Sequence, residues 1–382
     1  MQQPTISLSG PADLLAVLPY HFGFRLSRSV VVVCLHERRL GLVVRLDVVA
    51  EPARAVTVAA SLAEGLRREA PSSVMVIGYE DRVDETACLS EAIVRRLGVE
   101  RLTVADRIVV RADRWTGLMC HCCRDEPVPA PHEVGAVATY VRIGRAALES
   151  RDDLATVLHP TEPAPPTLAQ AIDDWVATVL DRDELFISCA ETGTRGGQVT
   201  WAEACLEAWR DLLAGEFDDR EVPEGQLSIL LGSLRDKRLR DGIIAVLCPR
   251  RLPDGVLDPR LAVLLDQYLA LVVNGVDADD DQDDDGQDVG DWDWTGLRSG
   301  DLGMLSRQAF TRSRLERLCR LAPESQAAPV LAVTAACAWF NGDGAAAGVA
   351  VERALELEPG HVLARLLESL LELGVRPPGL AA

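Results

Sequence analysis

The sequence predicts an α/β domain with a mixed sheet, followed by an all-α domain. In the first 160 residues, short runs rich in Val alternate with segments of helical spacing, a pattern typical of a sheet covered by helices. Beyond this point the β-branched runs fade and helix-start signals recur. The charge divides at nearly the same place, because residues 1–165 carry 19 bases against 21 acids and residues 166–382 carry 20 against 38. We therefore expect two domains, the first near neutral and the second strongly acidic.

The first domain is predicted to span residues 1–160. It begins with a helix opened by Pro11, whose missing N–H does no harm in a first helical turn. Two β-branched strands follow and form a hairpin around a tight turn. Each Val-rich strand needs burial on both faces, so helices should cover both sides of the sheet. In order, the expected elements are a helix to about His21, strands 29–36 and 39–49, helix 53–69, strand 72–80, helix 85–97, one or two strands in 102–111 and a closing helix 132–149.

The second half is predicted to be helical. The proline-rich segment 159–167 is a natural linker, and the capping box Thr200-Trp-Ala-Glu203 and the pair Asp258-Pro259 indicate helix starts. The assignments are a helical bundle at 167–275, an acidic flexible loop at 276–295 and a helical segment at 296–376 that ends in a hairpin.

The final hairpin resembles a single tetratricopeptide unit. Ala347, Ala354 and Pro359 stand at that family's spacing, while Val351 replaces the large aromatic residue that is usual there. The resemblance implies a peptide-binding groove. A solenoid needs about three repeats to bury its faces, and this chain offers one, so an ordinary hairpin that closes the domain is the other interpretation.

The composition excludes several activities. Lys237 is the one lysine beside 38 arginines, so the chain has no Gly-Lys-Ser/Thr of a nucleotide-binding P-loop. The acidic second half and the lack of a basic stripe argue against a nucleic-acid partner. The longest apolar stretches, 29–35 and 261–273, fall short of the roughly 20 residues that span a bilayer, and the N-terminus has no secretory signal. We expect a cytoplasmic protein with no membrane partner, whose ten cysteines are mostly buried, reduced thiols.

The most reactive-looking cluster is Cys120-His121-Cys122-Cys123. Cys120 and Cys123 have the two-residue spacing of a zinc knuckle or a redox pair, with His121 and His132 as possible further metal ligands. Tetrahedral zinc normally draws its ligands from two separated pairs, and a single pair is present here. Packed thiols, a zinc site and a redox or disulfide role all remain open at this point.

Carboxylates also follow two predicted strands. Tyr79-Glu80-Asp81 ends one strand and Asp47 ends another, and open α/β sheets often bind ligands at such strand ends. The acidic run Asp281 to Gly286 copies the first half of a calcium loop, but Trp292 stands where a bidentate Glu is needed, so we interpret the run as a solvated loop. No Gly-x-Ser-x-Gly or Gly-x-Gly-x-x-Gly motif is present.

Four segments together resemble an actinobacterial family classed as a domain of unknown function. They are SLSGPADLLAVLPYHFGFRLSRSVVVVCL at 7–35, the Arg-Trp and cysteine cluster at 114–123, SLRDKRLRD at 233–241 and ACAWFNGDGAAAGVAVERALELEPGHVLARLL at 336–367. The resemblance covers most of the chain and implies no particular activity or catalytic residues.

The sequence favours a non-enzymatic, cytoplasmic interaction or regulatory protein that binds a protein partner. The missing catalytic motifs, the charge asymmetry and the repeat-like hairpin support this hypothesis. The alternative is an enzyme, or a metal or redox protein, with a site near the Cys120 to Cys123 cluster and the strand ends. Convergence of Asp47, Glu80, Asp81 and Cys120 would favour that alternative.

Overall fold

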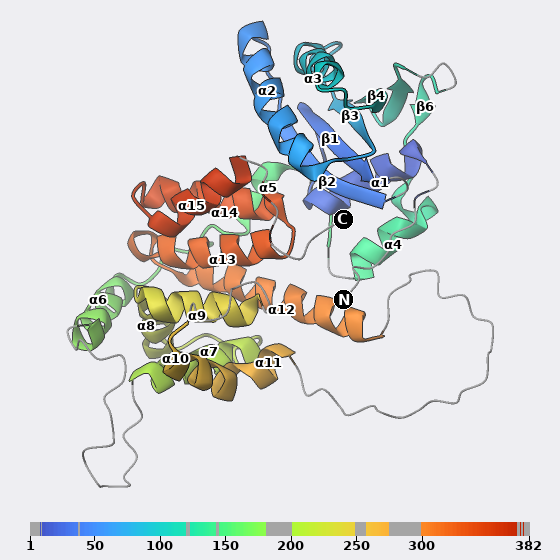
Figure 1. Ribbon diagram of the computed structural model, residues 1–382. Coiled ribbons are helices and arrows are strands. Elements are labelled where there is room, and N and C mark those ends of the chain that lie inside the picture. Colours follow the sequence, from blue (N-terminus) through green and yellow to red (C-terminus); the bar gives the residue numbers. More distant parts are fainter. Residues whose placement is uncertain are drawn as a thin grey trace, which may run out of the picture. The chain divides into compact units, whose positions relative to one another are not determined.

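The computed structural model describes residues 8, 10–36, 39–119, 123–142, 145–180, 201–248, 257–274, 299–372, 375 and 377. The chain divides into two compact units, a sheet unit built mainly from Ile6–Arg151 and a helical unit built mainly from Asp152–Glu368 (Figure 1). The predicted fold class is confirmed. The N-terminal region holds a mixed sheet with helices, and the described residues of the helical unit form no strand.

The centre of the sheet unit is a six-stranded sheet in the order β2-β1-β3-β4-β5-β6. β3 and β4 pair in parallel, and every other neighbouring pair is antiparallel. The first four strands lie where the sequence predicts them, whereas β5 and β6 were not expected. The strands are β1 (Ser29–His36), β2 (Arg39–Asp47), β3 (Ser73–Tyr79), β4 (Val104–Arg111), β5 (Arg114–Gly117) and β6 (Glu126–Pro127).

Helices cover both faces of this sheet. Figure 1 shows α2 (Pro52–Glu69) and α3 (Ala87–Val99) on one face, and α1 (Pro11–Phe22) and α4 (Gly135–Arg142) on the other. On β1, Val30 and Val32 belong to the core under α2 and α3, so Val31 points toward the opposite layer. All three side chains are fully buried, as a strand between two helical layers requires.

The helix α2 approaches the sheet through small side chains. Ala55, Ala59 and Ala63 recur every fourth residue, and with Leu66 they form its buried stripe. Residues four apart lie on the same face of a helix, so this spacing turns one narrow apolar stripe toward the sheet. The polar residues between them remain on the surface.

The predicted closing helix over 132–149 is wrong in its extent. α4 ends at Arg142, and further along the chain Leu148 forms a β-bridge with Phe24. The Leu148 N–H donates to the Gly23 carbonyl at 2.9 Å, and the Leu148 carbonyl accepts from the Arg25 N–H at 2.8 Å. These long-range bonds hold the segment extended, and no local pattern in the sequence reports them.

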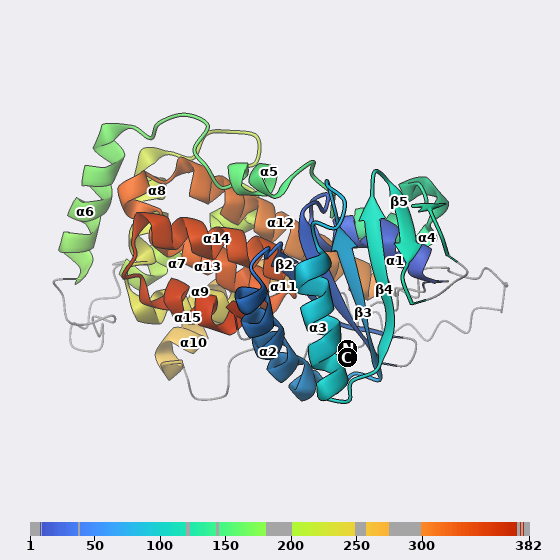
Figure 2. The same cartoon turned by 90° about the horizontal axis from the view of Figure 1, so that it is seen from above.

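The helical unit consists of packed helices around α13. Every residue of α13 from Ala328 to Trp339 is buried, and Figures 1 and 2 both show α13 beside α14. No described helix of the chain combines the length and apolar character that a membrane crossing requires. The helices are α5 (Arg151–Thr156), α6 (Pro166–Leu180), α7 (Trp201–Ala214), α8 (Glu224–Ser233), α9 (Lys237–Leu247), α10 (Pro259–Leu265), α11 (Leu271–Asn274), α12 (Ser299–Leu321), α13 (Ala328–Phe340), α14 (Gly344–Leu357) and α15 (Val362–Glu372).

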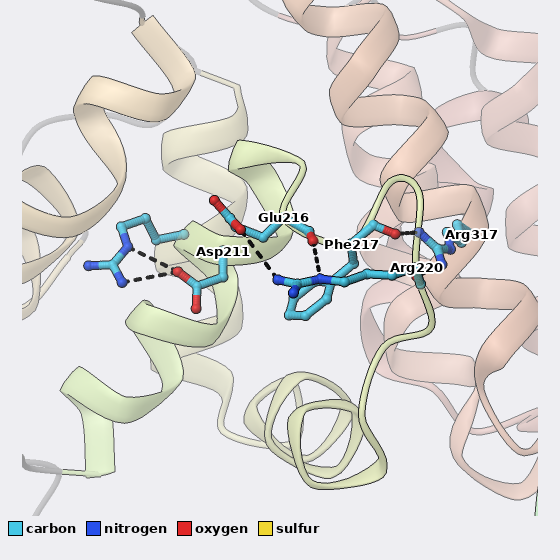
Figure 3. A network of polar contacts seen from close by, with 6 residues as sticks. Asp211, Glu216, Phe217, Arg220 and Arg317 are labelled. Carbon is cyan, nitrogen blue, oxygen red and sulfur yellow. Dashed lines mark hydrogen bonds and ion pairs between the residues drawn. The ribbon is translucent and has the colours of Figure 1, made fainter.

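Arginines of α12 hold the turn that follows α7. Arg314 pairs with Asp218 at 2.7 Å, and this hydrogen bond lowers the pKa of the Asp218 carboxyl. Arg317 donates to the carbonyls of Phe217 and Arg220, and Figure 3 shows it reaching Phe217 from the neighbouring helix. These bonds give the carbonyl oxygens of Phe217 and Arg220 a side-chain donor, in addition to the Arg220 N–H that donates to the Phe217 carbonyl at 3.3 Å.

Candidate functional site

Strand register brings the predicted carboxylates to one edge of the sheet. Ser29, the first residue of β1, lies opposite Asp47 of β2 and opposite Tyr79 of β3. Glu80 follows Tyr79 directly, and its N–H donates to the Val110 carbonyl of β4. Asp47 and Glu80 therefore share the edge at which the parallel strands β3 and β4 end, as the sequence predicted.

Glu80 itself is buried and fully engaged. One carboxylate oxygen accepts from the Thr86 N–H at 3.1 Å and from the Thr86 hydroxyl at 2.8 Å. The other accepts from the Asp84 N–H at 3.2 Å and lies 3.6 Å from an Arg111 guanidinium nitrogen. The carboxylate thus fixes the loop between β3 and α3. These hydrogen bonds are typical of a residue that anchors a loop, and not of a general acid or base.

Two further carboxylates of this edge, Glu85 and Asp47, are also paired. Glu85 accepts from Arg28 at 2.7 Å and from the N–H groups of Asp81 and Arg82, and the Arg28 hydrogen bond is the main cause that lowers the pKa of Glu85. Asp47 is exposed and lies 2.9 Å from Arg45. Among the described residues, this edge therefore carries ion pairs and loop-fixing contacts instead of a catalytic dyad.

The predicted metal ligands are only partly described. Cys120 and His121 lie outside the described residues, as do Asp281 to Gly286 and Trp292. Cys123 is partly buried, and its carbonyl accepts from the Gly117 N–H at 3.0 Å, whereas His132 is exposed in a short 3₁₀ helix, Pro131–Glu133. Within the described part of the chain, no three His, Cys, Asp or Glu side chains gather in a way that could hold a metal ion. Zinc binding stays a prediction.

The start of the cysteine segment lies away from the carboxylate edge. The N–H of Met119, the residue before Cys120, donates to Asp106 near the start of β4 at 3.0 Å. Glu80, in contrast, lies beside Val110 near the end of β4. Asp47 and Glu80 thus lie at one edge of the sheet, whereas Met119 lies toward the opposite end of β4.

The described cysteines behave as buried thiols. Of the seven, Cys34, Cys205, Cys248, Cys319 and Cys337 are buried, and none of the seven forms a disulfide. The predicted burial of most thiols is confirmed for this part of the chain, and their reduced state stays a prediction. Cys337 of α13 is within hydrogen-bond reach of Cys248 at the end of α9, and this contact together with burial raises the pKa of the Cys337 thiol. A raised pKa keeps a thiol protonated and unreactive.

Sequence reasoning missed a second polar feature, on the sheet face toward α1 and α4. Four buried side-chain atoms there have no hydrogen-bond partner in the described structure, and they belong to Ser29, Arg45, Tyr79 and Trp115. The Val-rich surroundings of Ser29 and Tyr79 are those of ordinary core strands. The sequence gives only one signal of this feature. Ser29 and Tyr79 are polar residues in strands that must be buried on both faces.

The fold defines a class of protein with a mixed α/β unit and a helical unit. The family model of the Domain of unknown function (DUF4192) matches residues 11–254 and 306–378, so the chain belongs to this family and the predicted resemblance to a family of unknown function is confirmed. Comparisons with curated proteins and with solved structures gave no match.

Proposed function

We propose that this protein is a non-enzymatic, cytoplasmic interaction or regulatory protein whose helical unit binds a partner protein. The observation that carries the proposal is the exposed apolar face of α15. Val362 is 62% exposed and Leu366, one helical turn later, is 58% exposed. Large apolar side chains that line up on one helix face are typical of a surface that another protein covers.

The packing before α15 supports a repeat-like role for the last helices. Ala335 of α13 and Ala347 and Ala354 of α14 are completely buried, so small side chains let the two helices approach closely. α15 follows this hairpin in the chain, and we treat it as the counterpart of the first helix of a further tetratricopeptide unit. In repeat proteins each unit buries its open face against the next, so a partner helix could cover the outer face of α15.

The hairpin is also held rigidly. Arg312 of α12 contacts Glu316 on its own helix and Asp343 at the start of α14, each at 2.7 Å. The Asp343 carboxylate accepts from the Ala346 N–H at 3.0 Å and so caps α14. A fixed hairpin presents α15 in one orientation, which reduces the entropy that binding would cost.

The charge of the second half indicates the chemistry of the partner. Residues 166–382 carry 20 bases against 38 acids, and Glu368 and Glu372 of α15 are exposed. A partner with an apolar helix flanked by basic residues would complement this surface. Such binding should weaken as the salt concentration rises.

The test uses the full chain as bait in extract of its native host. The variant carries Val362→Ser and Leu366→Ser, and the matched control carries Val263→Ser and Phe310→Ser, which change exposed apolar residues on α10 and α12. We expect a partner that binds the wild type and the control but loses at least about tenfold in recovery with the α15 variant. A partner retained by the α15 variant, or the absence of any reproducible partner, would contradict the proposal.

A further inference from the structure

His361 lies in the turn between α14 and α15, directly before Val362, the first residue of α15. It is 7% exposed. Its Nδ1 atom accepts a hydrogen bond from the Ala364 N–H at 3.3 Å, and its carbonyl accepts from the Arg365 N–H at 3.1 Å. The N–H groups in the first turn of a helix have no partner inside the helix. The imidazole therefore acts as the N-cap of α15.

The chemistry of this cap differs from that of other caps in the same unit. The helices α9, α10 and α14 are capped by the carboxylates of Asp236, Asp258 and Asp343. A carboxylate keeps its acceptor oxygens at any pH near neutrality. An imidazole accepts a hydrogen bond only in its neutral form, because both nitrogens of the protonated ring are donors. Mild acid can therefore remove the cap of α15 and leave the aspartate caps in place.

The surroundings of His361 oppose a positive charge on its ring. Burial is the main cause that lowers its pKa. Among the charged groups that act on the ring, Glu358 in the turn before α15 raises the pKa, whereas Arg240 of α9 and Arg235 just before α9 lower it. Arg240 is also paired with Asp241 at 2.7 Å. The positive end of the α15 helix dipole adds to the effect of the two arginines. The folded protein thus favours the neutral ring, which is the form that caps.

The capped turn carries part of the apolar face to which the proposed function assigns partner binding. Val362 follows the cap directly, and Leu366 lies one turn later. Ala364, the donor to the cap, is completely buried between them. The cap bond therefore fixes the start of α15 and with it the direction in which Val362 points. The first turn of a helix has few internal hydrogen bonds, so it opens readily when its cap is lost.

We propose that His361 is a pH-sensitive cap, which holds the first turn of α15 at neutral pH and releases it in mild acid. The inference rests on the proposed function, because the turn that opens carries Val362 of the partner-binding face. Opening exposes the imidazole, whose pKa then returns toward the ordinary value of 6.5. Below this value acid favours the opened turn, by up to about tenfold for each pH unit. Binding of a partner to α15 should weaken over the same range.

The first experiment measures hydrogen exchange of the full chain between about pH 7.5 and about pH 5.5. Each rate is divided by that of an unstructured peptide at the same pH, which removes the intrinsic pH dependence of exchange. The protection of residues 362–366 should stay constant above pH 6.5 and fall several-fold, by up to about tenfold, at about pH 5.5. The first turn of α14 is the internal control, and it should keep its protection because Asp343 caps it.

Two variants identify the titrating group. His361→Asn keeps an acceptor at the cap but does not titrate, so its protection of residues 362–366 should not change with pH. His132→Asn changes an exposed histidine of the sheet unit and should behave like the wild type. Wild-type protection of residues 362–366 that stays constant down to about pH 5.5 would overturn the proposal without any variant. An equal fall in His361→Asn would also overturn it, because another group would then be responsible.

A capture experiment at the same pH values separates this inference from the proposed function. The partner is the protein that the wild-type bait recovers from extract of the native host at about pH 7.5, and that the variant with Val362→Ser and Leu366→Ser loses. Its recovery should fall at about pH 5.5 with the wild type and persist with His361→Asn.

The outcomes of the two experiments are distinct. Absence of such a protein at about pH 7.5 would contradict the proposed function, while hydrogen exchange still decides whether His361 is a pH-sensitive cap. A partner that the wild type holds equally at both pH values would overturn the inference and leave the proposed function standing.

Discussion

Thr86 donates both its backbone N–H and its hydroxyl to one carboxylate oxygen of Glu80, at 3.1 and 2.8 Å. The same Thr86 side chain occupies the space that a side chain on Gly78 would need. The end of β3 and the start of α3 are thus locked by one polar contact and one steric contact. Both can be tested by conservative substitutions.

Gly78→Ala should destabilise the sheet unit. A Cβ atom at this position would lie 2.2 Å from Thr86 Oγ1 and 2.9 Å from Thr86 Cβ, and the bond to Glu80 prevents Thr86 from moving aside. We expect a loss of about 1–3 kcal/mol in the free energy of unfolding, measured with urea. Gly98→Ala is the control, because no atom lies within 4 Å of its Cβ position in α3, and it should stabilise by about 0.5–1 kcal/mol. Equal effects at both glycines would contradict this account.

Glu80→Gln should lower the free energy of unfolding, although it keeps the size of the side chain. The amide nitrogen would face an N–H group, either that of Thr86 or that of Asp84, where the native carboxylate accepts from both. Leaving a buried donor unsatisfied costs about 1–3 kcal/mol. Asp47→Asn removes the same charge at the same edge, but Asp47 is 81% exposed, so its loss should stay within about 1 kcal/mol. Urea unfolding of the two variants compares them directly, and a similar loss in both would refute an anchoring role for Glu80.

Arg317→Lys should loosen the turn after α7 without unfolding the helical unit. The guanidinium donates to the carbonyl of Phe217 (Figure 3) and to that of Arg220, and the compact ammonium group of lysine cannot reproduce this fork. Hydrogen exchange should become faster in residues 215–220 and stay unchanged in α13. Arg307→Lys on the same helix serves as the control. Unchanged exchange in the turn would show that these bonds do not hold it.

The stability of the helical unit should fall in mild acid because of His361. Its Nδ1 accepts from the Ala364 N–H at 3.3 Å and caps α15. Burial lowers its pKa, Arg240 and Arg235 lower it further, and Glu358 acts in the opposite direction. The unfolded chain therefore takes up a proton more readily than the native protein, and stability is lost as the pH falls below the ordinary value of 6.5.

His361→Asn keeps an acceptor at this cap position but does not titrate. Urea unfolding at several pH values should show the wild type losing stability relative to this variant below pH 6.5, with no change in the difference above it. His132→Asn changes an exposed histidine and should follow the wild type. Parallel pH profiles of the wild type and His361→Asn would rule out His361 as the cause.

The strands that the sequence predicted are those with a local signal. β1 and β3 are dense in valine and isoleucine, and their burial on both faces follows from that composition. β5 is short and contains Arg114, so its existence depends on pairing with β4. The turn between them has positive φ at Ala112 (49°) and Asp113 (56°), a hairpin turn without the usual Asn-Gly signal. The sequence therefore could not indicate it.

The candidate sites also include features that the sequence could predict and features that it could not. Asp47 and Glu80 could be placed at one edge from the sequence, because carboxylates at the ends of neighbouring strands meet there. The sequence could not show that the Glu80 carboxylate is hydrogen-bonded to Thr86, because this contact depends on the conformation of the loop between β3 and α3. Contacts of this kind are set by three-dimensional packing, which residue types alone do not encode.

By itself the sequence determined the fold class, the acidic character of the second half and the burial of its apolar runs, because these depend on composition and on local periodicity. Only the tertiary structure decided that Ser29, Tyr79 and Trp115 share one row. These residues are far apart along the chain, and strand register brings them together. Register follows from the pairing of whole strands and the packing of helices on both faces, which no single segment specifies.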